Sequence, residues 1–227
     1  MSVVTNKTYL FITNIKNLTP NLFKVFYSNL SAERKEKADK LKMQRDKDAS
    51  VSAEILLKYG LKKLGIEYNE LDYGYKQNKK PYLKGLSLPI EFNISHSGDY
   101  VICAISSNEV GCDIEKMNNI NLNIGKRFFH KYEYKHILEQ NTIERQKDLL
   151  YRYWTLKESF VKAVGCGIYN SLNKFCIIIG SKVGIEQDYT ANIFYFTEPH
   201  IDAKYKCAVC SLDKNIEIIN VDIKDMI

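Results

Sequence analysis

Two carboxylates stand two residues apart in the segment Gly111-Cys-Asp113-Ile-Glu115. In a β-strand, residues i and i+2 face the same side, so Asp113 and Glu115 would lie together while Ile114 turns into the core. Like charges at that distance repel each other unless they are solvated or bridged by a cation. Mg²⁺ suits such a pair because it takes hard oxygen ligands and keeps waters and phosphates among them. The segment therefore indicates either a magnesium site or a solvated strand edge.

A third carboxylate occurs in the segment Trp154-Thr-Leu-Lys157-Glu158-Ser-Phe-Val-Lys162. On a helix, Trp154, Glu158 and Lys162 share one face because they are spaced by four residues. The pattern is typical of an ordinary ion pair beside a core tryptophan. It also fits a third metal carboxylate at Glu158 and a phosphate-binding cation at Lys162.

Small polar residues end the apolar segment Phe92-Asn-Ile-Ser95-His96-Ser-Gly98. Ser95 and His96 could donate hydrogen bonds to a phosphate at such a strand end, or His96 could lie in a turn without a ligand. Upstream, Lys79-Lys80-Pro81 is a basic turn, a feature that is most often only solvated.

Hydrophobic periodicity predicts the elements that position these residues. Helices are expected after the Thr19-Pro20 cap, at 32–43 after Ser31, and at 46–64, 122–139 and 143–164, with Gly65 and Gly165 as stops. Strands are expected at 8–15, 174–180, 191–197, 205–212 and 216–223, and a small antiparallel sheet at 91–115. Cys103-Ala-Ile-Ser-Ser107 resembles Cys207-Ala-Val-Cys-Ser211, which favours two similar α/β halves with a boundary near 108–112.

Composition narrows the class of protein. The 227 residues are 45% hydrophobic with 11 glycines and 4 prolines, so a packed core needs no staples. The net charge of +6 suits solubility or an anionic partner. The chain shows no arginine-rich arm, zinc-finger spacing or aromatic RNA-binding signature, so nucleic acid is not expected. No apolar run reaches the roughly 18 residues of a membrane span.

The six cysteines favour a reducing compartment. Several lie within apolar runs, as buried free thiols do, and the N-terminal residues show no basic-then-apolar signal pattern. We therefore expect a cytoplasmic protein. Cys207-Ala-Val-Cys210 is a lone CxxC, which we interpret as part of a core strand rather than a redox or zinc motif.

Taken together, the four segments resemble the 4′-phosphopantetheinyl transferases, specifically the larger two-lobed kind that activates peptide synthetases. The family pattern comprises a lysine–proline turn, a Ser-His-Ser strand end, a G-x-D-x-E strand and a W-x-x-K-E-x-x-x-K helix. Here these are Lys80-Pro81, Ser95-His96-Ser97, 111–115 and 154–162, in the same order and spacing. The resemblance covers roughly residues 20–212.

The resemblance implies an α/β (α+β) fold of two similar subdomains related by a pseudo-twofold axis. Each subdomain is a small, mostly antiparallel sheet packed with helices. It implies an N-terminal lobe at 1–110, a C-terminal lobe at 111–227 and an active-site cleft between them. We expect a monomer, because two lobes can build such a cleft within one chain.

The resemblance also assigns roles to single residues. Asp113, Glu115 and Glu158 match the family's Mg²⁺ ligands, and Lys162 matches the lysine near the pyrophosphate. The positions that match coenzyme A contacts are Arg34, Lys37, Ser50, Lys80, Ser95 and His96, with Arg34 and Lys37 at the 3′-phosphate. Glu158 is our candidate for the general base. Gly165-Cys166-Gly167 departs from the glycine-lysine-glycine loop that is common in the family, so one basic contact is missing.

The implied activity moves the 4′-phosphopantetheine arm of coenzyme A onto a serine of an acyl, aryl or peptidyl carrier protein. Adenosine 3′,5′-bisphosphate leaves, and the net positive charge steers an acidic carrier. Phe128, Phe129 and Tyr132 could form a docking surface or core packing. Two other functions use the same residues: a magnesium-dependent nucleotide phosphohydrolase, and a non-catalytic module that binds coenzyme A or a carrier.

Overall fold

The computed structural model describes residues 7–68, 70–86, 88–166 and 172–226. The α-helices are α1 (Pro20–Ser28), α2 (Ala32–Asp39), α3 (Gln44–Lys63), α4 (Ile124–Phe128), α5 (Lys131–Leu138) and α6 (Ile143–Val164). Short 3-10 helices are η1 (Ile15–Asn17), η2 (Leu172–Lys174) and η3 (Ile223–Met226). The first strands are β1 (Thr8–Asn14), β2 (Tyr73–Tyr75), β3 (Pro81–Leu83), β4 (Glu91–Ser97), β5 (Tyr100–Ser106) and β6 (Val110–Lys116). The later strands are β7 (Cys176–Ile179), β8 (Val183–Glu186), β9 (Tyr195–Thr197), β10 (Tyr205–Ser211) and β11 (Ile216–Val221).

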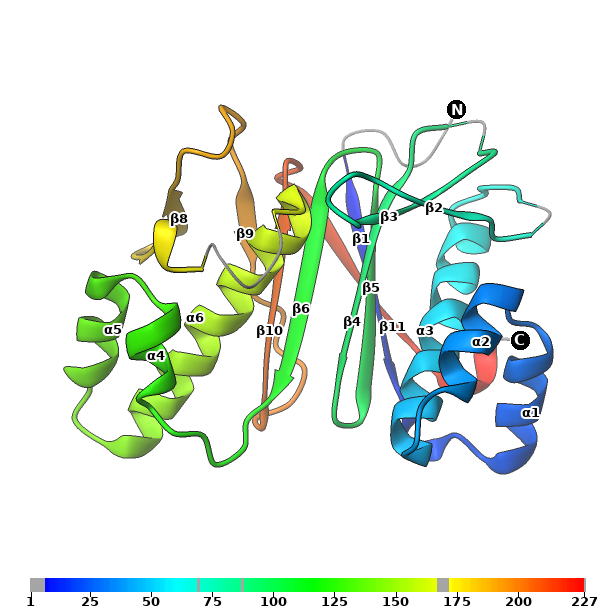
Figure 1. The fold of residues 1–227 in the computed structure, drawn as a ribbon, viewed down its shortest axis with the longest axis horizontal. Coiled ribbons are helices and arrows are strands. Elements are labelled where there is room, and N and C mark those ends of the chain that lie inside the picture. The colour runs from blue at the N-terminus through cyan, green and yellow to red at the C-terminus, as the bar shows by residue number, and fades with distance from the viewer. Residues whose placement is uncertain (1–6, 69, 87, 167–171, 227) are drawn as a thin grey trace.

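Two sheets lie face to face in the middle of the molecule, and helices cover their outer sides (Figure 1). Among the described residues, one sheet has the order β11-β1-β5-β4 and the other has the order β6-β10-β9. Side chains such as Leu10, Ile102, Ile114 and Val209 fill the layer between the sheets. The apolar layer fixes the distance between β4 and β6, which carry the predicted site residues.

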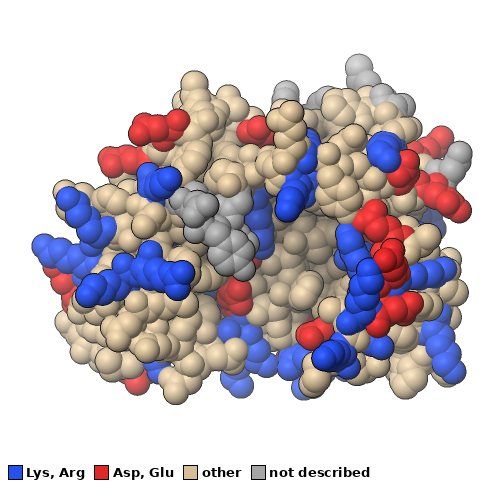
Figure 2. Space-filling view, in the orientation of Figure 1, with Lys and Arg blue, Asp and Glu red and all other residues tan. Residues whose placement is uncertain are grey.

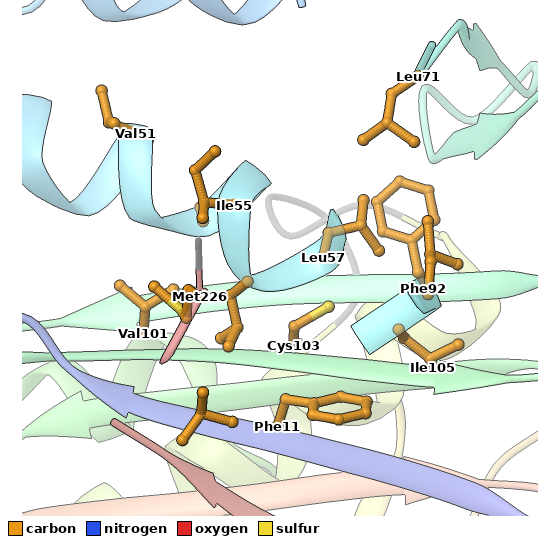
Figure 3. Packing of buried hydrophobic residues seen from close by; sticks show 14 of the residues in the cluster. Phe11, Val51, Ile55, Leu57, Leu71, Phe92, Val101, Cys103, Ile105 and Met226 are labelled. Carbon is orange, nitrogen blue, oxygen red and sulfur yellow. The ribbon is translucent and has the colours of Figure 1, made fainter. Parts of the chain in front are cut away.

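The first core lies between α3 and the four-stranded sheet. In Figure 3, Leu57 of α3 lies beside Phe92 of β4, with Cys103 and Ile105 of β5 and Phe11 of β1 below them. Leu57, Cys103, Ile105 and Phe11 are wholly buried. This packing holds α3 and the neighbouring α2 against one side of the β4–β5 hairpin.

The second core lies between α6 and the β6-β10-β9 sheet. Leu156 and Phe160 on the buried face of α6 pack with Ala208 and Cys210 of β10. The C-terminal end of α6 is set by Gly165, whose φ of +74° is the left-handed conformation that glycine adopts most easily. The two longest of the helices given above, α3 and α6, therefore cover the outer faces of the paired sheets.

The predicted fold class is confirmed: the protein is a mixed α/β structure of small, mostly antiparallel sheets and helices. The expected helix caps also form, since the hydroxyl of Thr19 accepts from Leu22 N and that of Ser31 accepts from Arg34 N. The division into lobes at 110/111 remains a prediction. One strand from the end of the chain, β11, pairs in parallel with β1.

Three sequence-based expectations are corrected. The region 91–115 does not form one antiparallel sheet, because β4 and β5 pair while β6 pairs with β10 in the other sheet. The expected helix 122–139 is broken into α4 and α5, since Phe129 is extended and His130 starts a new capping box with Glu133. The helix expected at 32–43 ends at Asp39.

The cysteine interpretation is confirmed for the CxxC pair. Cys207 and Cys210 are buried free thiols on β10, and they belong to different hydrophobic clusters on its two sides. In the described part of the chain, none of the helices combines the length and hydrophobicity of a bilayer-crossing segment.

Candidate active site

A glycine lets the helix and strand that carry the acidic residues approach each other closely. At Gly111 of β6, an added Cβ would lie 2.1 Å from Ser159 O and 2.4 Å from Ala163 N of α6. Only a residue without a side chain tolerates that approach. The contact explains the glycine of the G-x-D-x-E segment, because it brings the face of α6 that bears Glu158 and Lys162 over β6.

An ion pair joins α6 to β6 at the centre of this contact. The ammonium nitrogen of Lys162 lies 2.6 Å from Oδ1 of Asp113. The same oxygen accepts a hydrogen bond of 2.9 Å from the hydroxyl of Ser95 on β4, and Lys162 donates to that hydroxyl at 3.2 Å. The structure therefore brings Ser95, Asp113 and Lys162 together from three elements that are distant in sequence.

Burial raises the pKa values of all three acidic side chains, and the charge of Asp113 adds to the shift of the other two. Burial raises the pKa of Asp113, and Lys162 opposes the shift. The pKa of Glu115 is raised by burial and then by the charge of Asp113. That of Glu158 rises to about 7, first through burial and next through Asp113. Burial lowers the pKa of Lys162, but Asp113 outweighs it and the pKa is raised.

This cluster has the chemistry of a divalent cation site. One oxygen of Asp113, Oδ2, is buried and has no hydrogen-bond partner within the described residues. Mutual repulsion among three carboxylates is what a bound cation relieves. In the described residues, no group of three histidine, cysteine, aspartate or glutamate side chains converges on a single metal position. Asp113, Glu115 and Glu158 fit Mg²⁺ by the chemistry of their carboxylates and by the Oδ2 of Asp113, unpartnered among the described residues, although their present arrangement does not form a metal position, and Lys162 occupies Oδ1 of Asp113.

A basic groove of about 350 Å³ opens beside β4. Arg34 and Lys37 of α2 line it together with His96 of β4, and Asn93, Tyr73 and Tyr75 are among its other lining residues. Lys37 is held by Glu33 at 2.5 Å and by the hydroxyl of Tyr75 at 2.7 Å. The structure thus gathers three of the predicted coenzyme A contacts in one groove. Figure 2 shows a hollow between the two halves of this face, with lysine and arginine side chains on its rim.

Among the titratable residues that line this groove, His96 is the one whose ordinary pKa, 6.5, lies closest to neutral pH. Desolvation lowers the pKa of His96, the charges of Lys162 and Arg34 lower it further, and Asp46 partly opposes them. The side chain is exposed, so a ligand could reach it. A bound phosphate would reverse the shift by favouring the protonated imidazole.

Lys80, Ser50 and Ser95 are buried and do not line the groove. The ammonium of Lys80 is buried and donates to Ala163 O at 2.8 Å and to Val110 O at 3.1 Å, and it lies 3.3 Å from Glu91 Oε2. These bonds tie the Lys-Pro turn to the end of α6, so the expected contact of Lys80 with a phosphate requires that this network open.

The two serines are similarly placed. Ser50 on α3 is only 7% exposed. The hydroxyl hydrogen of Ser95 is directed to Asp113, which leaves its oxygen as an acceptor for Lys162. Gly167, which completes the predicted Gly-Cys-Gly loop, lies outside the described residues.

The sequence analysis missed Glu54, a wholly buried carboxylate of α3. Its oxygens accept from Ser31 N at 2.6 Å, Ser31 Oγ at 2.7 Å and the hydroxyl of Tyr73 at 3.0 Å. Arg34 Nε lies 3.6 Å from the same carboxylate. Glu54 thereby joins α2 to the wall of the basic groove. An acidic residue inside the apolar face of a helix was the available signal, because a buried charge must be paired.

Lys157 has a different role from its neighbour Glu158. It is completely buried, and its ammonium contacts Glu133 at 2.6 Å and Phe175 O at 2.8 Å. This buried pair links α6 to α5 and faces the second core rather than the acidic cluster. Lys157 therefore belongs to the packing of the motif helix.

The aromatic residues after the acidic strand divide between core and surface. Phe129 is 4% exposed and packs in the second core, while Tyr132 is 63% exposed on α5. Phe128 is partly buried with its ring 5.8 Å from that of Trp154. For Phe129, the core alternative is confirmed.

A larger cavity of about 560 Å³ lies on the α1 side of α3. It is lined by α1, α3 and the chain end, including Lys58, Lys62 and Tyr59. None of the predicted site residues lines it.

Comparison with known proteins identifies two matching sequence families. Residues 109–210 match the 4′-phosphopantetheinyl transferase superfamily, and residues 17–108 match the family described as 4′-phosphopantetheinyl transferase, N-terminal. The chain is 30% identical to 4′-phosphopantetheinyl transferase gsp of Aneurinibacillus migulanus over 93% of this chain and 89% of that protein. It is 36% identical to 4′-phosphopantetheinyl transferase Sfp of Bacillus subtilis (strain 168) over 82% of this chain and 84% of that protein.

Among solved structures, the holo-[acyl-carrier-protein] synthase of Thermotoga maritima superposes with a TM-score of 0.40 at 20% identity. The superposition covers 47% of this chain and 64% of that chain.

Proposed function

The chain belongs to the 4′-phosphopantetheinyl transferase family, and from this premise we propose how it acts and which residues act. It is an enzyme that transfers the 4′-phosphopantetheine group of coenzyme A to a serine of a carrier protein. The serine oxygen forms a bond to the phosphorus next to the pantetheine arm. The bond from that phosphorus to the bridging oxygen breaks, and adenosine 3′,5′-bisphosphate leaves.

One observation carries the assignment of residues. Asp113, Glu158 and Lys162 meet where α6 crosses β6, and the basic groove with Arg34 and His96 opens beside the same strand pair. Acidic residues that favour a cation beside basic residues that favour an anion are what a pyrophosphate and its metal require. The arrangement supports transfer at a phosphorus atom held between the two.

Asp113, Glu115 and Glu158 are the residues that would hold Mg²⁺. When bound, the ion would neutralise charge on the pyrophosphate and polarise its oxygens. Lys162 would release Asp113 and bind the leaving phosphate instead. Arg34 and Lys37 would bind the 3′-phosphate, and His96 would donate to the pyrophosphate.

Glu158 is our candidate for the group that takes the serine proton. A serine hydroxyl is a weak nucleophile and needs a base close to neutrality. Without a cation, burial and Asp113 raise the pKa of Glu158 to about 7, and a bound cation would lower it and keep the carboxylate ionised to accept the proton. The carrier is expected to be an acidic protein, because the protein bears a net charge of +6.

The decisive experiment is mass spectrometry of apo acyl and peptidyl carrier proteins incubated with this protein, coenzyme A and Mg²⁺. We expect each substrate carrier to gain the mass of one phosphopantetheine group, and we expect chelation of the metal to prevent it. A carrier variant without its acceptor serine is the control. Carriers that stay unmodified while coenzyme A is hydrolysed would contradict the proposal.

A further inference from the structure

Side chains of β4 join the two sheets at the active site. Oδ1 of Asn93 accepts from Cys112 N at 2.9 Å, and Oγ of Ser97 accepts from Lys116 N at 3.0 Å. Between them, Oγ of Ser95 lies 3.4 Å from Ile114 N. These three contacts, which we call the side-chain seam, advance by two residues along both strands. Side-chain oxygens of β4 therefore accept from backbone N–H groups of β6, as the carbonyl oxygens of a neighbouring strand would.

The seam fixes the direction of each serine hydroxyl. A backbone N–H can only donate, so the N–H of Lys116 occupies an acceptor position on Oγ of Ser97. The single hydroxyl hydrogen of Ser97 is then directed to Oε2 of Glu115 at 3.0 Å. The same logic holds for Ser95, which accepts from Lys162 and donates to Asp113.

Contacts other than those of the hydroxyl hold Ser97 in place. Ser97 is the last residue of β4, and Gly98 in the following turn has a φ of +57°. Asp99 N donates to the hydroxyl of Tyr205 on β10 at 3.0 Å, and Lys116 Nζ lies 3.5 Å from Asp99 Oδ2. The hairpin end is thus attached to the other sheet by its turn. Loss of the Ser97 hydroxyl alone should leave the backbone where it is.

We propose that Ser97 is a positioning residue, whose hydroxyl holds the Glu115 carboxylate in the orientation that binds the divalent cation. This inference rests on the proposed function. Glu115 is only partly buried near the end of β6, so its flexible side chain could otherwise turn toward solvent. A hydrogen bond to a carboxylate is strong enough to select one rotamer from several. The hydroxyl of Ser97 donates to Glu115, a proposed metal ligand, so Ser97 acts through that carboxylate.

The test compares three variants of the full-length protein. Ser97→Ala removes the hydroxyl, and Ser97→Thr keeps it on a residue that suits a strand. Asn93→Ala is the matched control, because it removes a seam bond that involves no carboxylate. Since Asn93 also lines the basic groove, its metal affinity is compared with that of the parent at saturating coenzyme A. Two quantities are measured for each: Mn²⁺ affinity by electron paramagnetic resonance with coenzyme A present, and the Mg²⁺ concentration that half-saturates transfer. Thermal unfolding reports on the fold.

For Ser97→Ala we expect Mn²⁺ affinity to fall about tenfold, the effect of one hydrogen bond to a charged group, with a matching rise in half-saturating Mg²⁺. The turnover rate at saturating Mg²⁺ should stay within about twofold of the parent, since no group that contacts the reacting atoms is lost. Ser97→Thr should restore the metal affinity. Asn93→Ala should unfold at a lower temperature and bind Mn²⁺ as the parent does.

Unchanged metal affinity in Ser97→Ala would overturn the inference. So would an equal loss in Asn93→Ala, because the seam would then act only through the fold. A parent protein that binds Mn²⁺, shows the Ser97 effect and transfers nothing would contradict the proposed function and leave the role of Ser97 supported. A parent that binds no Mn²⁺ would contradict both.

Discussion

Lys162 and Asp113 form an ion pair of 2.6 Å that spans from α6 to β6. The same aspartate keeps a second, buried oxygen, for which the described residues provide no hydrogen-bond partner. One side chain therefore presents one oxygen to a cationic residue and one to a prospective cation. If Lys162 moved from this carboxylate to a phosphate, the pyrophosphate would be contacted by both the Lys162 ammonium and the cation.

The first prediction concerns Asp113→Asn. The substitution keeps the size of the side chain but removes the charge that a cation and Lys162 both need. We expect transfer to fall by about 10³-fold, the scale of losing one electrostatic contact in a transition state. Circular dichroism should show the parent's secondary structure. The activity assay is the mass shift of the carrier.

Asp148→Asn is the matched control, because Asp148 also pairs with a lysine, Lys206 at 2.8 Å, but on the surface. It should transfer at the parent rate. If Asp113→Asn kept a high rate of transfer, Asp113 would not be a ligand of the metal.

The second prediction concerns pH. Desolvation, with Lys162 and Arg34, lowers the pKa of His96 below its ordinary 6.5, so the folded protein binds this proton less tightly than the unfolded chain. The stability contributed by the neutral imidazole is present above pH 6.5 and is lost as the pH falls through the folded pKa. Urea unfolding of the parent and of His96→Gln, between pH 7.5 and 5.5, should show a steeper acid loss in the parent.

Nuclear magnetic resonance of the imidazole provides a second readout. Saturating coenzyme A should raise the pKa of His96, because a phosphate favours the protonated ring. If the pKa stays the same with and without coenzyme A, His96 does not contact the phosphates.

The third prediction concerns Glu54→Gln. The amide retains an acceptor for Ser31 but removes the charge facing Arg34, which lies 3.6 Å away. Arg34 should then be less well fixed at the groove, and KM for coenzyme A should rise about tenfold with little change in kcat, since binding and not chemistry is affected. Steady-state kinetics with varied coenzyme A measures both.

Lys58→Met provides the control, since Lys58 lies 3.6 Å from the other oxygen of Glu54 and lines the 560 Å³ cavity rather than the basic groove. Its KM should match that of the parent. A lower kcat in Glu54→Gln at unchanged KM would refute a role in fixing Arg34.

The sequence predicted local features of the fold better than it predicted which helices and strands contact one another. Helix caps such as Thr19 and stops such as Gly165 depend on neighbouring residues, and both were found where expected. The partner of β6 was not predictable, because alternation shows which face is buried and not which strand lies beside it. The same limit applies to the site: its acidic residues were recognised as motifs, whereas Glu54 and the contact of Ser97 with Glu115 depend on pairs of elements.

The fourth prediction concerns the buried pair of Lys157 and Glu133, whose charged atoms are 2.6 Å apart. Lys157→Met should lower the free energy of unfolding by about 3–5 kcal/mol, because it leaves the Glu133 carboxylate buried without its cation. Chemical denaturation measures the change. The double variant Lys157→Met, Glu133→Gln should recover part of it, since the amide is uncharged and can still accept from Ile177 N, which now donates to Glu133 at 2.6 Å. A double variant as unstable as the single one would show that packing, not charge, sets the loss.

The fifth prediction separates docking from packing on the segment after β6. Tyr132 is 63% exposed on α5, whereas Phe129, three residues earlier, is 4% exposed in the second core. We expect Tyr132→Ala to raise KM for the carrier several-fold and to leave the unfolding free energy within about 0.5 kcal/mol of the parent, as for a surface substitution. Phe129→Ala should instead cost about 3–5 kcal/mol of stability, because it leaves a cavity.

Carrier kinetics at several salt concentrations complete this test. The net charge of +6 should speed encounter with an acidic carrier, so kcat/KM for the carrier should fall as salt rises. Tyr132→Ala should keep the parent's salt dependence, because it removes contact area and no charge. If KM for the carrier is the same in Tyr132→Ala as in the parent, the carrier docks elsewhere, and a rate that is flat with salt would exclude electrostatic steering.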